Sequence, residues 1–319
     1  MSTAAKVPET WELTGDDARK TLAETGRGRL VKDAFVRLRA ADGFSHARSL
    51  AFVTSLVLVQ GLIALVGFTT AFDLRLGREI VAAIQSAVPG PAGHLLTDAV
   101  EQARKVGVHH RYLPLLLGLA GTLITGTTAM GQIERGFNRI YGIERDRPTT
   151  QKYGRAFVLM VGAGTGLALA FLVFALGRQS ETADSLLRST WPWLRWPLGL
   201  AVAMLALSAL LRWAPRRRQP AWSWLMFGAS VCVAGWVLVT VALSLALSLS
   251  SSFGTTYGPL AGLVALQLWT LFSAIAIFYG AAVAAQLEAV RAGMPQPRDE
   301  TAAVNEPIVR QRETTSYAS

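Results

Sequence analysis

Residues 219–287 read QPAWSWLMFGASVCVAGWVLVTVALSLALSLSSSFGTTYGPLAGLVALQLWTLFSAIAIFYGAAVAAQL and carry no charged side chain over 69 positions. A helix needs about 20 apolar residues to cross the hydrocarbon of a bilayer, so this run is too long for one span. It contains a turn-rich break at 250–259, where Ser, Gly, Thr and Pro interrupt the apolar pattern. The stretch therefore predicts two transmembrane helices, near 221–248 and 259–287.

Upstream stretches of the chain have the same character. Four further spans are predicted near 49–72, 112–133, 156–177 and 194–213. The last has a short uncharged core, but tryptophans flank it, and indole rings favour the lipid–water interface. Charged residues make up 16% of the chain, whereas soluble domains carry about 25%. We therefore expect an all-α fold, a polytopic membrane helix bundle with six transmembrane helices between residues 49 and 290.

The basic residues predict the orientation of this bundle. If the spans alternate in direction, 23 of the 31 Lys and Arg residues fall on one side of the membrane, in segments 1–48, 134–155, 212–220 and 288–319. Loops rich in Lys and Arg stay in the cytoplasm, so both chain ends are expected there. Residues 1–48 would form a cytoplasmic N-terminal region. The polar, Pro-containing tail 291–319 is expected to be disordered.

Residues 29–39 are predicted to form a basic amphipathic helix ahead of the first span. At 100° per residue, one arc of the helical wheel is apolar and contains Leu30, Val31, Ala34, Phe35 and Leu38. The charged residues, Arg37 among them, fall outside this arc. Such a helix typically lies on cytoplasmic headgroups. Acidic residues nearby argue against nucleic acid as its partner, so membrane lipid is the expected one.

The sequence offers little for catalysis. Its four histidines lack metal-ligand spacing, and its one cysteine, Cys232, lies within an apolar run. No Gly-Lys-Ser/Thr phosphate loop is present. We therefore expect no enzyme activity, no metal and no cofactor.

Polar residues inside the spans are candidates for a path through the membrane. They are Gln60 in the first span, Thr122, Thr125 and Thr128 in the second, and Gln267 in the sixth. Unpaired polar groups are costly in lipid, so such side chains have partners or line a polar cavity. Two interpretations stay open: a ligand path, or hydrogen bonds that join neighbouring helices.

The cytoplasmic end of the second span carries a second candidate site. If the helix continues beyond the membrane, Glu134, Arg135, Asn138 and Arg139 share one of its faces. Two arginines four residues apart suit a phosphate or another anionic headgroup. The alternative is an ordinary positive anchor at the membrane surface, with a Glu–Arg pair.

The chain resembles the YihY/BrkB family of bacterial inner-membrane proteins, and within it a YhjD-like branch. The likeness covers roughly residues 30–290 and rests on short motifs in order: ERGFNRIYGI at 134–143, YGPLAG at 257–262, Leu268-Trp269 and Tyr279-Gly280-Ala281. Ser49-Leu50-Ala51-Phe52 is a weaker match. Departures occur at Gln60, where the family often has a nearby Pro, and at Ala282, where it has an acidic residue.

The resemblance implies a multi-pass protein of the inner membrane, with transport of lipids or other envelope components suggested. The family was once labelled ribonuclease BN, but the His-x-His-x-Asp-His cluster of a metal-dependent nuclease is missing from the sequence. Two hypotheses follow. One is a transporter or lipid-handling protein with anionic phospholipid as partner; the other is a structural or scaffolding membrane protein. The oligomeric state stays open, a homo-oligomer included.

Overall fold

The structure is a computed structural model that describes residues 2–72, 80, 81, 84, 85, 88, 90–176, 185–250, 257 and 260–299. Within these ranges the side chains of 108, 163, 167–176, 185–189, 191, 192 and 195 are not described. The described chain is all-α: apart from an isolated bridge between Ala4 and Arg298, its regular structure is helical.

The helices follow the apolar runs of the sequence. Two short helices come first, α1 (Gly15–Thr25) and α2 (Arg27–Ala40). The longer helices are α3 (Gly43–Ala71), α5 (Gly90–His109), α6 (Leu113–Ile140), α7 (Thr149–Leu176), α8 (Ser185–Trp213), α9 (Trp222–Leu249) and α11 (Ala261–Arg291). The turn-rich break at 250–259 thus falls between α9 and α11, as predicted.

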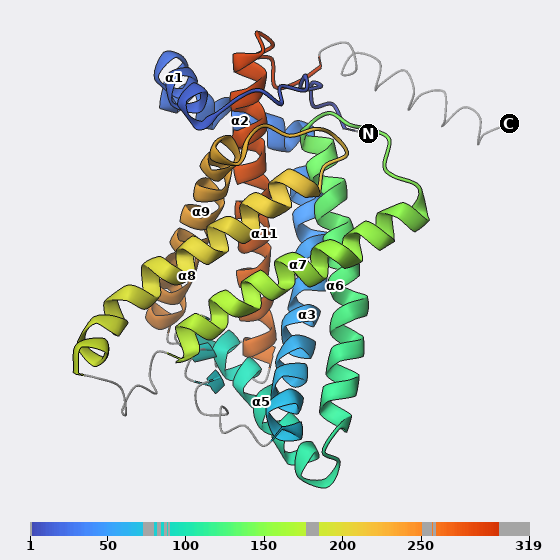
Figure 1. The fold of residues 1–319 in the computed structure, drawn as a ribbon, viewed down its shortest axis with the longest axis vertical. Helices are drawn as coiled ribbons and strands as arrows, with labels where there is room; N and C mark the ends of the chain where they lie inside the picture. The colour runs from blue at the N-terminus through green and yellow to red at the C-terminus, as the bar shows by residue number, and fades with distance from the viewer. Residues whose placement is uncertain are drawn as a thin grey trace, which may run out of the picture.

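Helix α11 runs along the long axis of the molecule, with α3 and α6 on one side of it and α9 on the other (Figure 1). Helices α7 and α8 pack against each other and cross this group obliquely. Helices α1 and α2 lie at one end of the bundle and α5 at the opposite end.

Among the described residues, five helices are long and apolar enough to cross a membrane: α3, α6, the 196–213 part of α8, α9 and α11. In the most apolar 18-residue stretch of α11, 44% of the residues are buried inside the protein, but in that of α9 only 11% are. Exposed apolar side chains such as Ile124 (70%) and Leu238 (69%) would form a large hydrophobic surface in water. Their natural solvent is lipid. The predicted span near 156–177 falls in α7, whose later side chains lie outside the described residues.

Helices α3 and α6 approach each other closely through glycines. A Cβ added to Gly67 would lie 2.2 Å from the Leu115 nitrogen, and one added to Gly118 would lie 2.4 Å from the Ala64 nitrogen. Both distances are far below ordinary van der Waals contact. Small residues therefore set the spacing of this pair, as is common between membrane helices.

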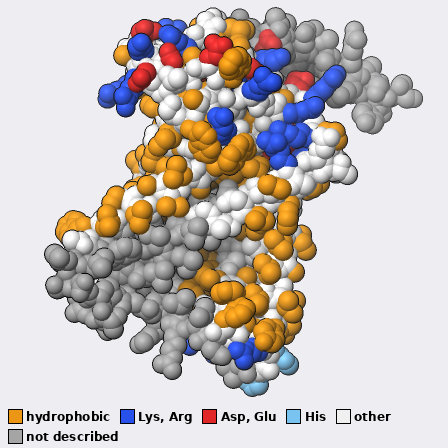
Figure 2. Space-filling model, viewed as in Figure 1, with side chains coloured by type: hydrophobic (Ala, Val, Ile, Leu, Met, Phe, Trp, Pro, Cys, Tyr) orange, Lys and Arg blue, Asp and Glu red, His pale blue; other side chains and the backbone are white. Residues whose placement is uncertain are grey.

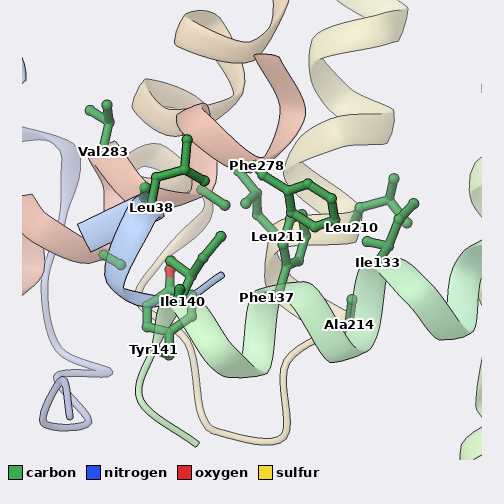
Figure 3. Packing of buried hydrophobic residues seen from close by; sticks show 14 of the residues in the cluster. Leu38, Ile133, Phe137, Ile140, Tyr141, Leu210, Leu211, Ala214, Phe278 and Val283 are labelled. Carbon is green, nitrogen blue, oxygen red and sulfur yellow. The ribbon is translucent and has the colours of Figure 1, made fainter. Parts of the chain in front are cut away.

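The larger hydrophobic cluster lies where α2, α6, α8, α9 and α11 meet, near the end that carries α1 and α2. Figure 3 shows Phe137 of α6 facing Phe278 of α11, with Leu38, Ile140 and Leu211 nearby. The two phenyl rings are perpendicular, with centroids 5.9 Å apart, a favourable arrangement for aromatic side chains. A second cluster joins α3, α5 and α11 towards the opposite end.

Two predictions about the cytoplasmic segments need correction. Helix α2 buries Leu30, Ala34, Arg37 and Leu38 but leaves Val31 and Phe35 exposed. The buried face of α2 therefore includes Arg37 and excludes Val31 and Phe35. Arg37 lies seven residues after Leu30, which is nearly two helical turns, so the two side chains lie on the same side of the helix. Residues 292–299 were expected to be disordered, but they fold back and hydrogen-bond to the N-terminal segment. The rest of the tail lies outside the described residues.

Candidate functional site

Charged side chains gather at the end of the bundle that carries α1 and α2. We call this end the cap: residues 2–42, 134–155, 212–221 and 284–299. Figure 2 shows Lys, Arg, Asp and Glu concentrated there, above a broad hydrophobic surface over the helices. The cap has buried charges as well as exposed ones.

A buried ion pair joins the end of α6 to the loop that follows it. The Glu134 side chain is fully buried, and Arg147 Nη1 donates to its Oε1 over 2.6 Å. The same guanidinium donates to the backbone oxygens of Ala214 and Pro215, each over 3.0 Å. Arg147 therefore ties the 141–148 loop to the loop between α8 and α9.

A second buried pair lies between that loop and α11. Arg217 Nη2 donates to Glu288 Oε1 over 2.6 Å, with side-chain exposures of only 2% and 0%. The guanidinium also lies over the Tyr141 ring, 4.6 Å from its centroid, a cation–π geometry. Burial, together with the charge of Glu288, raises the pKa of the Tyr141 phenol.

Arg37 is the third buried charge of the cap. Its Nε donates to Gln286 Oε1 over 2.7 Å, and its other nitrogens donate to the backbone oxygens of Ala5, Ile140 and Gln296. Burial lowers the pKa of this guanidinium to about 10, so it stays charged at neutral pH. One side chain therefore holds together the N-terminal segment, α6, α11 and the start of the tail.

A partly buried carboxylate of the cap, Asp146, is surrounded by an excess of positive charge. Asp146 Oδ2 lies 3.2 Å from Arg135 Nε and 3.5 Å from Lys152 Nζ. Burial on its own would raise the pKa of Asp146, but the hydrogen bond from Asn138 and the charges of Lys152, Arg139 and Arg135 hold it below its usual range. One carboxylate thus faces three cations.

The four residues predicted to contact a headgroup differ in their accessibility. Glu134 and Asn138 are fully buried; Asn138 Nδ2 donates to Asp146, and its Oδ1 accepts from the Arg216 amide. The side chains of Glu134 and Asn138 therefore bond to other parts of the protein and are not accessible from outside it. The Arg135 side chain is 46% exposed. Arg139 donates to the backbone oxygens of Ile143 and Glu144.

The polar residues within the spans make hydrogen bonds within or between helices. Gln60 Oε1 accepts from Thr125 Oγ1 over 2.6 Å, which joins α3 to α6. Gln267 Oε1 accepts from Ser55 Oγ over 3.2 Å, which joins α11 to α3. Thr122 and Thr128 donate to backbone oxygens four residues earlier in α6. A role of these residues in a ligand path stays a prediction.

Several cap residues were not singled out by the sequence: Arg37, Asp146, Arg147, Arg217 and Glu288. Two signals were present. Arg37 is seven residues after Leu30 and so shares its side of a helix, and Glu288 is an isolated acid after a long apolar run. Nothing in the sequence pairs Arg217 with Glu288, because the partners are 71 residues apart. Within the part of the chain that the structure describes, no group of three His, Cys, Asp or Glu side chains could hold a metal ion.

The fold, with its lipid-compatible helices and a charged cap, defines an integral membrane protein of the multi-helix class. The chain belongs to the virulence factor BrkB family, whose model matches residues 34–305. It is similar to the putative ribonuclease-like protein YfkH of Bacillus subtilis strain 168, with 25% identity over 265 residues, 81% of this chain and 94% of that protein. No solved structure matches the chain. The predicted resemblance to the family is thereby confirmed, whereas the YhjD-like branch stays a prediction.

Proposed function

We propose that this protein spans the bacterial inner membrane six times, with both ends and the cap in the cytoplasm, and that it handles anionic lipids at the cap. The observation that carries the proposal is the Arg135–Asp146–Lys152 cluster. Its cations outnumber its carboxylate, and Arg135 is half exposed. A lipid phosphate is the anion that a membrane surface supplies in quantity.

The position of Arg135 along α6 supports this proposal. Helix α6 begins at Leu113, and 22 residues at about 1.5 Å each place Arg135 about 33 Å along its axis. The hydrocarbon of a bilayer is about 30 Å thick. If the apolar start of α6 lies at one membrane surface, Arg135 reaches the headgroups of the other.

Helix α2 also supports a position of the cap at the level of the lipid headgroups. Val31 and Phe35 are 56% and 45% exposed, and Phe35 packs edge-on against Phe44 at the start of α3, with ring centroids 5.9 Å apart. The exposed residues Arg29 and Lys32 lie near them in the sequence. An apolar edge beside basic residues is typical of a helix that lies in the membrane interface.

The proposal is tested by lipid binding in nanodiscs that contain phosphatidylglycerol and phosphatidylcholine. Arg135→Ala is expected to weaken enrichment of phosphatidylglycerol about fivefold, since one basic residue near an anionic surface contributes about 1 kcal/mol. Arg19→Ala is the matched control, because Arg19 lies in α1 with its side chain 88% exposed and pairs only loosely with Asp16. Equal effects of the two substitutions would indicate a general charge effect and refute a site at Arg135.

A scaffolding function is the second candidate, and the interhelical hydrogen bonds favour it. Gln60 and Gln267, the amides that would line a path, both bond to a neighbouring helix instead. Reconstitution into vesicles separates the two functions. Faster movement of a fluorescent phosphatidylglycerol across the bilayer than in protein-free vesicles supports lipid handling, whereas binding without movement supports a scaffold.

A further inference from the structure

The N-terminal residues 2–14, which we call the strap, run across the cap and contact each of its parts through the main chain. The Thr3 amide donates to Ala40 of α2, the Ala5 amide to Pro297, and the Val7 amide to Tyr141. The Leu13 oxygen accepts from Ala221, which precedes α9. These bonds are 2.8–3.2 Å long. The strap therefore lies in a groove formed by four separate segments of the chain.

Buried charged side chains of the cap bind the backbone of the strap. Arg37 Nη1 donates to the Ala5 oxygen over 2.8 Å, and Arg217 Nη2 donates to the Pro8 oxygen over 2.7 Å. Glu288 Oε1 accepts from both the amide and the hydroxyl of Thr10, over 3.3 and 2.6 Å. Two cations thus bind peptide oxygens, and one carboxylate binds a peptide N–H.

Three hydroxyls of the strap bond to the cap: Ser2 donates to the Arg139 oxygen, Thr3 to the Ala40 oxygen and Thr10 to Glu288. Its other side chains contribute less specificity than its backbone. Ala4 and Val7 are small and buried, whereas Lys6 and Glu9 point away and are exposed. The groove also needs a glycine at its floor: a Cβ added to Gly142, which has φ +71°, would lie 2.6 Å from the Lys6 Cα. Recognition by main-chain hydrogen bonds with shallow side-chain pockets is typical of sites for extended peptides.

The strap lies outside the part of the chain that matches the family model, whereas the residues that contact it lie inside that part. The family model begins at residue 34, so the strap and α1 lie outside the match. Arg37, Arg217 and Glu288 all lie inside it. The groove is therefore built from the matched part of the chain, and the segment that fills it comes from the part before the match.

We propose that the cap contains a binding groove for an extended peptide, and that the strap is a displaceable ligand for this groove carried by the chain itself. Because the strap is tethered, its effective concentration at the groove is on the order of millimolar, and the occupied state prevails. Displacement of the strap uncovers Arg37, Arg217 and Glu288. The groove is thus a site at which another peptide of the same backbone geometry acts on the cap.

The first test measures displacement in the full-length protein in nanodiscs. A fluorophore is attached at Glu9→Cys, since Glu9 is exposed and the native Cys232 is buried. A synthetic peptide with the sequence of residues 2–14 is expected to raise the mobility of the label in a saturable manner. The same peptide with Thr10→Pro lacks both donors to Glu288 and is expected to act at least tenfold more weakly. Failure of the native peptide to displace the strap, or equal action of both peptides, would overturn the proposal.

The second test measures hydrogen exchange and needs neither label nor added peptide. In the full-length Arg217→Gln variant, the amides of Val7 and Thr10 are expected to exchange at least tenfold faster than in the native chain, while the amides of Phe137 and Ile140 at the cap end of α6 keep their native rates. A strap that is simply part of the folded core would lose protection together with α6. That joint loss, or unchanged exchange in the strap, would refute displaceability.

Discussion

Replacement of Gly118 by alanine tests whether the α3–α6 contact holds the bundle together. The new Cβ would lie 2.4 Å from the Ala64 nitrogen and 2.9 Å from the Gln60 oxygen, both backbone atoms of α3. Backbone cannot rotate away as a side chain can. The two helices must therefore separate until these distances approach 3.4 Å, where ordinary van der Waals contact begins.

The cost has two parts. Forced separation of about 1 Å corresponds to overpacking of a tight contact, which costs about 1–3 kcal/mol. The Thr125–Gln60 hydrogen bond lies two turns further along the same contact, and its loss adds about 0.6 kcal/mol, the average for such bonds in membranes. We therefore expect Gly118→Ala to lower the free energy of unfolding by about 1.6–3.6 kcal/mol and Tm by about 3–14 °C.

The assay is thermal unfolding of the purified protein in one detergent, with Gly162→Ala as the matched control. A Cβ at Gly162 in α7 meets no atom within 4 Å, so alanine there should be neutral or slightly stabilising. In a double-mutant cycle, Gln60→Leu should cost less in the Gly118→Ala background, because the hydrogen bond is already broken. If Gly118→Ala is as stable as Gly162→Ala, close packing of α3 and α6 is not what holds these helices together.

Two further predictions concern the charges of the cap. Arg147→Met leaves Glu134 buried and unpaired, so it should lower the free energy of unfolding by about 3–5 kcal/mol. Arg135→Met removes a partly exposed pair and should lower it by less than about 1 kcal/mol. Denaturant titration measures both values, and equal losses of stability would contradict the importance of the buried pair. Because the pKa of Asp146 is lowered in the folded state, its contribution to stability is present above about pH 4, near the ordinary pKa of Asp, and is lost as the pH falls further. Thermal unfolding from pH 7 to pH 3 should show this loss in the native chain and a weaker one in Asp146→Asn; parallel curves would refute the assignment.

How far the sequence predicts the structure differs between the spans and the cap. Run length and the break at 250–259 predicted the helices that became α9 and α11 within a few residues, because an apolar run of fixed length is itself the requirement for a span. For Gln60, the sequence left two interpretations open, and the structure places its amide against Thr125. A polar residue in a span needs a partner, but only the packing of two helices says which one.

The cap shows the opposite situation. The sequence predicted an amphipathic helix at 29–39 from the sum of its residues, yet it assigned Arg37 to the polar side. The apolar arc and the buried arc differ because burial depends on what lies opposite, here Gln286 of α11 and the backbone of Ala5. No local pattern contains that information.

The 69 uncharged residues at 219–287, with the shorter apolar runs before them, determined by themselves that this protein is an all-helical membrane protein. Hydropathy is a local property, and the bilayer responds to it one segment at a time. The tertiary structure alone decided that Glu288, the first residue after that region, binds both Arg217 and Thr10. These partners are 71 and 278 residues away along the chain, and only the folded chain brings the three together, out of water, where each charge must find a partner.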